Sequence, residues 1–274
     1  MNIRRVVLVY YSATGNTRNV VVSLGKQIGE ILNAAVEEFS YTSPASRQKH
    51  YSFSPEDLVL FATCVYAGRV PNKMLPFVES GFTGNGALAV PIVTFGNRSF
   101  DNGLIELRNL LEANGFHTIA AAAVATNHVF SDVIAPGRPD RADKEILENF
   151  ARKVAEKVHK LESIPQPIEV PGENPPTTYY TPLGVDGKPT MFLKAKPQTH
   201  ENMCDACGLC VEACPMAAIS EEDPCQVPGT CIKCQACVKI CPTNAKYFDD
   251  ENFLSHVKML EMNYTERKEP RIFL

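Results

Sequence analysis

The chain has 274 residues, a formal net charge of −4 and 45% hydrophobic residues. The length allows about two domains, and the balance of hydrophobic and charged residues excludes a wholly disordered chain. The mild acidity argues against nucleic acid as a partner, because nucleic-acid-binding domains carry a basic excess, and the longest uncharged stretches are too short to span a bilayer.

Strands and helices are predicted to alternate over the first 161 residues. Short apolar runs predict buried strands at residues 4–11, 34–40, 57–63, 88–95 and 116–126. Apolar residues at helical spacing predict helices at residues 18–32, 72–79, 102–114 and 139–161. This alternation indicates an α/β fold with a doubly wound parallel sheet of five strands.

The first predicted strand begins with Arg4 and Arg5, and this basic pair with the apolar run after it could resemble a targeting signal. Its apolar run is shorter than the hydrophobic core of a signal peptide, and no small-residue cleavage site follows. We therefore expect a cytoplasmic protein with no membrane partner.

A proline-rich segment separates this α/β region from the rest of the chain. Residues 163–200 contain eight of the twenty prolines, which exclude regular helix and limit strand pairing. We predict an α/β domain at 1–162, an extended linker at 163–200, a small cysteine-rich α+β domain at 201–249, and a C-terminal helix and tail at 250–274. Residues 201–274 carry seven basic and twelve acidic residues, a net charge of −5.

Nine of the ten cysteines lie between Cys204 and Cys241. Eight of them form two C-x2-C-x2-C-x3-C-P runs at an offset of 27 residues, which is the bacterial ferredoxin pattern. Three cysteines of such a run bind three corners of a [4Fe–4S] cubane, and the fourth binds the other cluster. The two predicted ligand sets are Cys204, Cys207, Cys210 with Cys241 (cluster I), and Cys231, Cys234, Cys237 with Cys214 (cluster II).

Zinc and disulfides are the alternatives for these cysteines. A zinc site would need paired C-x2-C hooks, and a disulfide framework would suit a short secreted chain. Cys225 is left over, either as an unligated thiol, which is favoured, or as a further ligand, and Cys64 is expected to be a small core residue. Residues 202–247 resemble bacterial two-cluster ferredoxins, and the resemblance implies one-electron transfer at low potential.

A small polar loop, Ser12-Ala-Thr-Gly-Asn-Thr17, lies between the first predicted strand and helix. Its hydroxyls and the backbone N–H groups at the helix N-terminus could hold an anion such as a terminal phosphate. The loop has no lysine and no G-x-G-x-x-G pattern, so neither a Walker loop nor a dinucleotide site is favoured. The alternative is a plain Ser/Thr-rich helix cap.

The same loop resembles the phosphate loop of flavodoxins, [ST]-x-T-G-x-T, and the resemblance extends from residue 1 to about 161. It implies FMN as a cofactor, with a phosphate loop and two loops that sandwich the isoalloxazine. The chain has no tryptophan, so tyrosine or phenylalanine rings, or the backbone, would have to contact the flavin. The implied FMN-binding residues are Ser12, Thr14, Gly15, Asn16, Thr17, Tyr66, Ala67, Gly68, Phe95 (or Phe100), Gly96, Asn97, Arg98 and Asp101.

Two roles remain open among these loops. Arg98 and Asp101 hold the polar edge of the flavin or form an ion pair with each other. His128, which follows the fifth predicted strand, is either a proton donor or a structural residue.

The whole chain resembles a family of flavodoxin–ferredoxin fusions found in anaerobes. We expect an electron-transfer protein that relays electrons between two [4Fe–4S] clusters and FMN, and on to a redox protein that is its donor or acceptor. The alternative is an FMN-dependent reductase of a small molecule such as a quinone or an activated alkene. A redox sensor is a third possibility, which no DNA-binding motif supports.

Overall fold

One parallel sheet contains the five predicted strands, in the order β2-β1-β4-β6-β8. They are β1 (Arg5–Tyr10), β2 (Ala35–Ser40), β4 (Asp57–Cys64), β6 (Leu88–Phe95) and β8 (Ala121–Ala125). The computed structural model describes residues 2–274 and places Val6 opposite Val36 on one side and Leu58 on the other. Counted along the chain, the strands run 2-1-3-4-5, which is the flavodoxin-like order. The predicted fold class is therefore confirmed.

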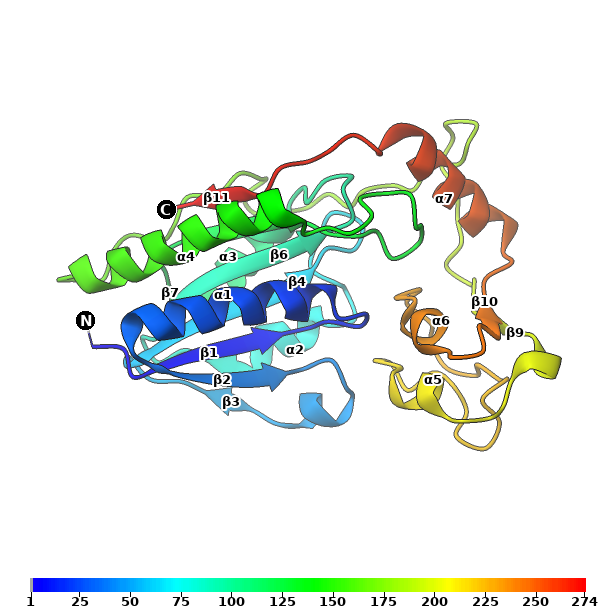
Figure 1. Cartoon of the computed structure of the whole chain (residues 1–274), viewed down its shortest axis with the longest axis horizontal. Coiled ribbons are helices and arrows are strands. Elements are labelled where there is room, and N and C mark those ends of the chain that lie inside the picture. Colours follow the sequence, from blue (N-terminus) through cyan, green and yellow to red (C-terminus); the bar gives the residue numbers. More distant parts are fainter. Residues whose placement is uncertain (1) are drawn as a thin grey trace.

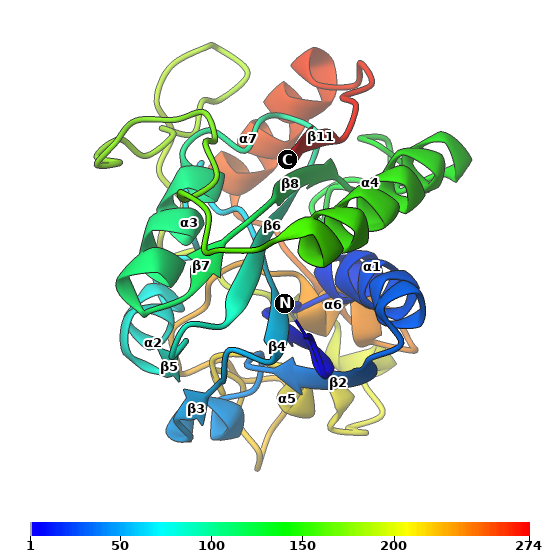
Figure 2. The same cartoon turned by 90° about the vertical axis from the view of Figure 1, so that its left-hand side faces the viewer.

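Helices cover both faces of this sheet (Figure 2). Helices α1 (Asn16–Leu32) and α4 (Arg141–Lys160) pack on one face, and α2 (Leu75–Ser80) and α3 (Gly103–Ala113) on the other. Along β1, Val6 and Leu8 face α1 and α4, whereas Val7 and Val9 face α2 and α3. Because both faces are covered, the strands are continuously apolar rather than alternating. No helix within residues 2–274 combines the length and apolar character needed to cross a membrane.

Short elements complete the α/β region. Strand β3 (Tyr51–Ser52) pairs with β5 (Phe82–Thr83), and a 3-10 helix spans Ala45–Gln48. The fifth predicted strand is divided into β7 (His117–Thr118) and β8, and both pieces pair with β6.

The cysteine-rich region lies beyond the carboxyl ends of the strands, toward which the arrows of β1 and β2 point in Figure 1. It contains a 3-10 helix (Glu201–Met203) and two short helices, α5 (Leu209–Glu212) and α6 (Ala236–Ile240), each of which carries the third cysteine of a run. Strands β9 (Gln198–Thr199) and β10 (Lys246–Tyr247) pair at its base. So few regular elements are typical of a domain in which metal ligation supplies folding energy.

The predicted linker is extended and fixed to its surroundings. Residues 161–197, all of them described, form no helix and a single isolated bridge, Leu183 to Pro189. Near its start, the Ile168 N–H donates to the Thr118 carbonyl at 3.1 Å, and further on the Tyr180 N–H donates to the Ala67 carbonyl at 2.9 Å. The segment therefore contacts the sheet and a loop at its carboxyl end.

The predicted C-terminal tail is wrong in part. Helix α7 (Glu251–Asn263) is present, but the chain then returns to the sheet as β11 (Arg271–Phe273), antiparallel to β8. Its pairing covers the edge of β8 that would otherwise present unpaired backbone groups. Three residues are too few to show a strand period in the sequence.

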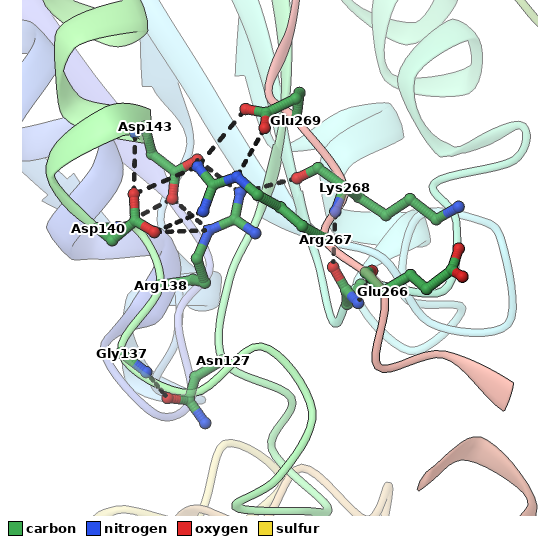
Figure 3. Close-up of polar contacts among 10 residues, drawn as sticks. Asn127, Gly137, Arg138, Asp140, Asp143, Glu266, Arg267, Lys268 and Glu269 are labelled. Atoms are coloured by element: carbon green, nitrogen blue, oxygen red, sulfur yellow. Dashed lines mark hydrogen bonds and ion pairs between the residues drawn. The ribbon is translucent and has the colours of Figure 1, made fainter. Parts of the chain in front are cut away.

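Ion pairs fasten the returning segment to the start of α4 (Figure 3). The Arg267 guanidinium contacts Asp140 and lies 2.9 Å from the fully buried Asp143 carboxylate. Arg138 pairs with the same Asp143 and donates to the Lys268 carbonyl at 2.7 Å. Asp140 and Asp143 also form a capping box at the N-terminus of α4. We name these four side chains, Arg138, Asp140, Asp143 and Arg267, the clasp.

Asn97, which was expected to contact the flavin, instead holds the segment before β11. It is fully buried, and its side-chain amide donates to the carbonyls of Tyr264 (2.7 Å) and Glu266 (2.8 Å). The Lys268 N–H donates to its Oδ1 at 3.3 Å. Asn97 does not line the large cavity described below, so its side chain is engaged elsewhere and its contact with FMN stays a prediction.

We predict that Asn97→Gly lowers the free energy of unfolding by about 2–3 kcal/mol, because buried partners lose their hydrogen bonds. Asn97→Ala should cost about 1 kcal/mol more, because the backbone φ of 65° disfavours a Cβ. Urea unfolding measures both values, and limited proteolysis near residue 264 reports release of the segment.

The control for this prediction is Asn33→Gly, at an exposed asparagine that also has a positive φ. It should leave the free energy of unfolding nearly unchanged. Equal losses at positions 33 and 97 would contradict the anchoring role.

Candidate functional site

A cavity of about 730 Å³ lies beyond the carboxyl ends of β1, β4, β6 and β8. This volume is in the range of sites that enclose a small-molecule ligand. Its floor comes from the loops that follow these four strands, within residues 12–17, 64–73, 94–99 and 126–130. Its other walls come from residues 179–193, 230–234 and helix α7.

The loop at residues 12–17 is built to receive an anion. Gly15 is the N-cap of α1 with φ of 89°, and a Cβ there would meet no atom within 4 Å. Among the described residues, the backbone N–H groups of residues 13–17 meet no acceptor. The first turn of α1 has no acidic residue, so nothing there competes with an anion at the positive end of the helix dipole.

The side chains of this loop divide their roles. Thr14 lines the cavity, and its hydroxyl has no partner within residues 2–274. Ser12 Oγ accepts from the Arg18 N–H at 3.1 Å, and Thr17 Oγ1 lies 2.7 Å from Thr94 Oγ1. Asn16 also lines the cavity, but its amide donates to the Asn127 carbonyl at 3.0 Å. Asn16 therefore links two strand-end loops.

The loop after β4 turns sharply at Ala67 and Gly68, which have φ of 48° and 79°. Tyr66 and Arg69 exchange two backbone hydrogen bonds across this turn, as in a two-residue hairpin. Tyr66, Ala67 and Gly68 all line the cavity. Arg69 is held by a buried ion pair with Glu106, which also accepts from the Val70 N–H at 2.8 Å. The loop is therefore rigid before any ligand binds.

Arg98 and Asp101 pair with each other. Asp101 is not part of the cavity wall, so of the two roles left open for this pair the structure shows the ion pair, and a contact of Asp101 with a cofactor stays a prediction. Arg98 does line the cavity, and its guanidinium lies 3.7 Å from the centre of the Tyr180 ring. From the same loop, Phe95 and Gly96 reach the cavity as expected, and Phe100 packs against Phe95 at 5.6 Å between ring centres.

His128 also lines the cavity, and Gly96 makes room for it. A Cβ at position 96 would lie 2.2 Å from Cδ2 of the imidazole. The Phe130 N–H donates to His128 Nδ1 at 3.1 Å, so the neutral ring carries its proton on Nε2. The pKa of His128 is lowered to about 4, mainly by burial and also by the nearby His256 and Arg98. The ring is therefore a neutral hydrogen-bond donor at pH 7.

The four cysteines predicted for cluster II, namely Cys214, Cys231, Cys234 and Cys237, line one small cavity of about 20 Å³. Backbone N–H groups already point at three of the sulfurs predicted as ligands, one of which is Cys231, which accepts from the Lys233 N–H at 3.4 Å. Ala218 N–H donates to Cys214 Sγ at 3.3 Å, and Ala245 N–H donates to Cys241 Sγ at 3.2 Å, which are equivalent positions in the repeat. Such hydrogen bonds suit bound thiolates.

The set predicted for cluster I lies nearer the surface. The thiol of Cys210 interacts electrostatically with those of Cys204 and Cys241, which belong to the two different runs. Cys207 is exposed. Cys225, the surplus cysteine, lies beside Cys204.

All ten cysteines are free thiols. Within residues 2–274, no three His, Cys, Asp or Glu side chains are arranged to hold a single metal ion. In a cubane, by contrast, each of the four thiolates binds a different iron.

The two cavities share a wall. Thr230, Cys231, Ile232 and Cys234 line both the large cavity and the cysteine cavity. Cys64 packs against the core, as expected, but it also lines the large cavity and interacts electrostatically with Cys234. Burial raises the pKa of Cys64 to about 12, so its thiol stays protonated.

The other side of the large cavity was not predicted. Tyr179, Tyr180 and Phe192 of the linker line it, together with His256 and Leu260 of α7. The only signal is that these aromatic residues interrupt a proline-rich segment that has no helical or strand period.

We predict that acidification destabilises the wild type more than His128→Gln. The folded pKa of about 4 lies below the unfolded value of 6.5. As the pH is lowered, His128 therefore binds a proton first in the unfolded state, and the free energy of unfolding decreases. Between pH 7.5 and 5.5 the wild type should lose about 1 kcal/mol more than the variant. Urea unfolding at the two pH values measures this difference.

His50→Gln, at an exposed histidine, serves as the control and should behave as the wild type. If His128→Gln and the wild type lose the same free energy, His128 is not buried in its neutral form.

Comparison with protein families matches only the cysteine-rich region. Two family models, both described as 4Fe–4S binding domain, match residues 197–220 and 228–244. No curated protein sequence matches the chain.

Solved flavodoxin structures are similar to the α/β region. They include a flavodoxin from the domain Archaea (16% identity, 57% of this chain and 99% of that chain, TM-score 0.41) and one from Streptococcus pneumonia TIGR4 (19%, 56% and 99%, 0.41). Oxidised flavodoxin 2 from Bacillus cereus is similar at 15% identity (56% and 99%, 0.39). Because these scores are low, the fold assignment rests on the strand order. The chain thus joins a flavodoxin-like α/β domain to a C-terminal 4Fe–4S ferredoxin-type domain.

Proposed function

We propose that this chain is an electron-transfer protein that relays electrons between two [4Fe–4S] clusters and FMN, and on to a redox partner. One observation carries the proposal. Cys231 and Cys234 line the small cavity of the cluster II cysteines (the cysteine cavity) and also the large cavity, whose floor includes the loop at residues 12–17 (the anion loop). A cluster bound by these cysteines would therefore border the ligand in the large cavity.

The residues present fit FMN. The unpartnered N–H groups of residues 13–17 and the Thr14 hydroxyl would hold its phosphate, and the loops at residues 66–68 and 95–98 would border its ring. Bound FMN would exchange electrons singly or in pairs, which matches one-electron clusters to two-electron partners. The chain's own contribution is to position that ring beside residues 230–234.

The exposure of the cysteines supports an order for the relay. Cys234 and Cys237, of the set predicted for cluster II, are buried, whereas Cys207, of the set predicted for cluster I, is exposed. Cluster II would therefore be the inner cluster and cluster I the outer one. Electrons would therefore be exchanged with a protein partner at cluster I and reach the flavin through cluster II. The net charge of −5 of residues 201–274 suits a partner with a basic docking face. Free thiols and clusters suit the cytoplasm, and an anaerobe as the source.

The alternative function, an FMN-dependent reductase of a small molecule, is favoured by a different observation. The linker and α7 cover the large cavity and add His256 beside His128. A covered cavity with hydrogen-bonding side chains suits a small substrate as well as a cofactor.

The relay is tested on protein purified without air, which should contain about eight irons and one FMN per chain. After photochemical reduction of the flavin, electrons should pass to the clusters, as followed by electron paramagnetic resonance. Cys234→Ser should abolish this transfer, because it removes a ligand of the inner cluster.

The matched variant is Cys207→Ser, which alters the outer cluster. It should keep transfer between flavin and cluster II but slow reduction by an external one-electron donor. Equal effects of the two substitutions, or no transfer in the wild type, would contradict the proposed order.

The phosphate loop is tested with Thr14→Val, which removes one hydroxyl from the cavity wall. The affinity for FMN should fall about tenfold, the equivalent of one hydrogen bond of about 1.4 kcal/mol. Fluorescence titration of flavin-stripped protein measures it, and the iron content should stay constant. Ser23→Ala, an exposed position on the same helix, should bind FMN as the wild type does; an unchanged affinity in Thr14→Val would reject the phosphate site.

A further inference from the structure

The large cavity has a roof formed by residues 179–193 of the linker. At one end, the Tyr180 N–H donates to the Ala67 carbonyl at 2.9 Å. At the other end, the Lys233 ammonium donates to the Leu193 carbonyl at 2.5 Å. The roof is therefore attached to the loop after β4 and to the wall shared with the cysteine cavity.

Helix α7 holds the middle of the roof. His256 Nδ1 donates to the Leu183 carbonyl at 2.8 Å, and the Asn252 amide donates to the Met191 carbonyl at 3.2 Å. The roof folds back on itself between these contacts, with Thr190 N–H bonded to the Pro182 carbonyl. A protein partner cannot reach the floor of the cavity through a segment fixed at so many points, so an additional partner on this side must be a small molecule.

Aromatic rings make the roofed part of the cavity suited to a flat ligand. Phe192 is stacked on His256, with 5.3 Å between ring centres and 27° between planes. Phe130 packs edge-on against His128 at 5.0 Å. Tyr180 lies under the Arg98 guanidinium, and its hydroxyl is buried with no partner among the described residues.

Three of the polar side chains that line this region carry hydrogen-bond donors. His128 presents Nε2–H because its Nδ1 accepts from the backbone. Tyr180 has an unused O–H, and Arg98 adds a guanidinium that Asp101 already neutralises. Donors without a net charge suit a neutral acceptor such as a carbonyl oxygen better than a carboxylate or a phosphate.

We propose that the roofed part of the cavity binds a small, planar conjugated carbonyl compound of the quinone class, with His128 Nε2–H donating to its carbonyl oxygen and Phe192 against its plane. This inference rests on the proposed function, which brings electrons into the same cavity. Reduction of a quinone to a hydroquinone takes two electrons and two protons. The electrons come from the reduced flavin and clusters, and the protons come from water.

The test uses the full-length protein loaded with FMN and clusters, purified without air and kept in its oxidised form, because it then has no electrons to give and binding can be measured without turnover. The probe is 1,4-naphthoquinone, and the readouts are equilibrium dialysis and the change in flavin absorption. Phe192→Ala and His128→Ala should each weaken binding at least tenfold while the FMN and iron contents stay those of the wild type. Val185→Ala, an exposed position of the same linker segment outside the cavity wall, should bind the probe as the wild type does.

Two outcomes overturn the inference. One is wild-type protein with full FMN and iron that does not bind naphthoquinone, which leaves the relay intact. The other is loss of FMN in the Phe192 and His128 variants, which would assign these side chains to the flavin. A wild type without FMN or iron would instead refute the proposed function itself.

Discussion

Residues 230–234 form the one wall on which both cavities depend. Cys231 and Cys234 face the cysteine cavity on one side and the large cavity on the other. The wall is fixed from within, because the Lys233 N–H donates to Cys231 Sγ at 3.4 Å, and from the roof, through the Lys233 ammonium. Displacing this segment would alter the ligand set of one site and the shape of the other. The relative position of the two cavities is thus set within five residues, and the rest of the chain supports that arrangement.

The parts of the site that the sequence predicts are those encoded by local spacing. The apolar runs predict the five parallel strands, and parallel strands bring their carboxyl-end loops to one edge. The anion loop and the two cysteine runs are local motifs as well, and the structure brings Cys214 to Cys231, Cys234 and Cys237 as the repeat predicts. Asn97 shows what local spacing does not predict. Its loop is identified correctly, but its side chain turns to carbonyls about 170 positions away in sequence, at Tyr264 and Glu266.

The roof could not be predicted because its contacts have no sequence period. Prolines indicate that residues 163–200 form neither helix nor regular sheet, but they do not determine the path of the chain. That path follows two cation–π contacts, Arg69 over Tyr179 and Arg98 over Tyr180, and single backbone hydrogen bonds. β11 escaped prediction for a similar reason, since three residues pairing with β8 carry no recognisable pattern.

The path of the chain also decides how the two domains are joined. A flexible linker would only raise the local concentration of one domain near the other. Here the chain leaves the α/β domain after α4, passes over the cavity, forms the cysteine-rich domain, and returns through α7 to add β11 to the same sheet. The cysteine-rich domain is therefore held at both of its ends, and the clasp and Asn97 fasten the returning segment. Lys239 to Asp132 and Arg47 to the Pro215 carbonyl add direct contacts between the domains. Because the distance between the two cavities is fixed by these attachments, the proposed electron transfer would not wait for the domains to find each other, and the exposed Cys207 would leave the proposed partner a place to dock.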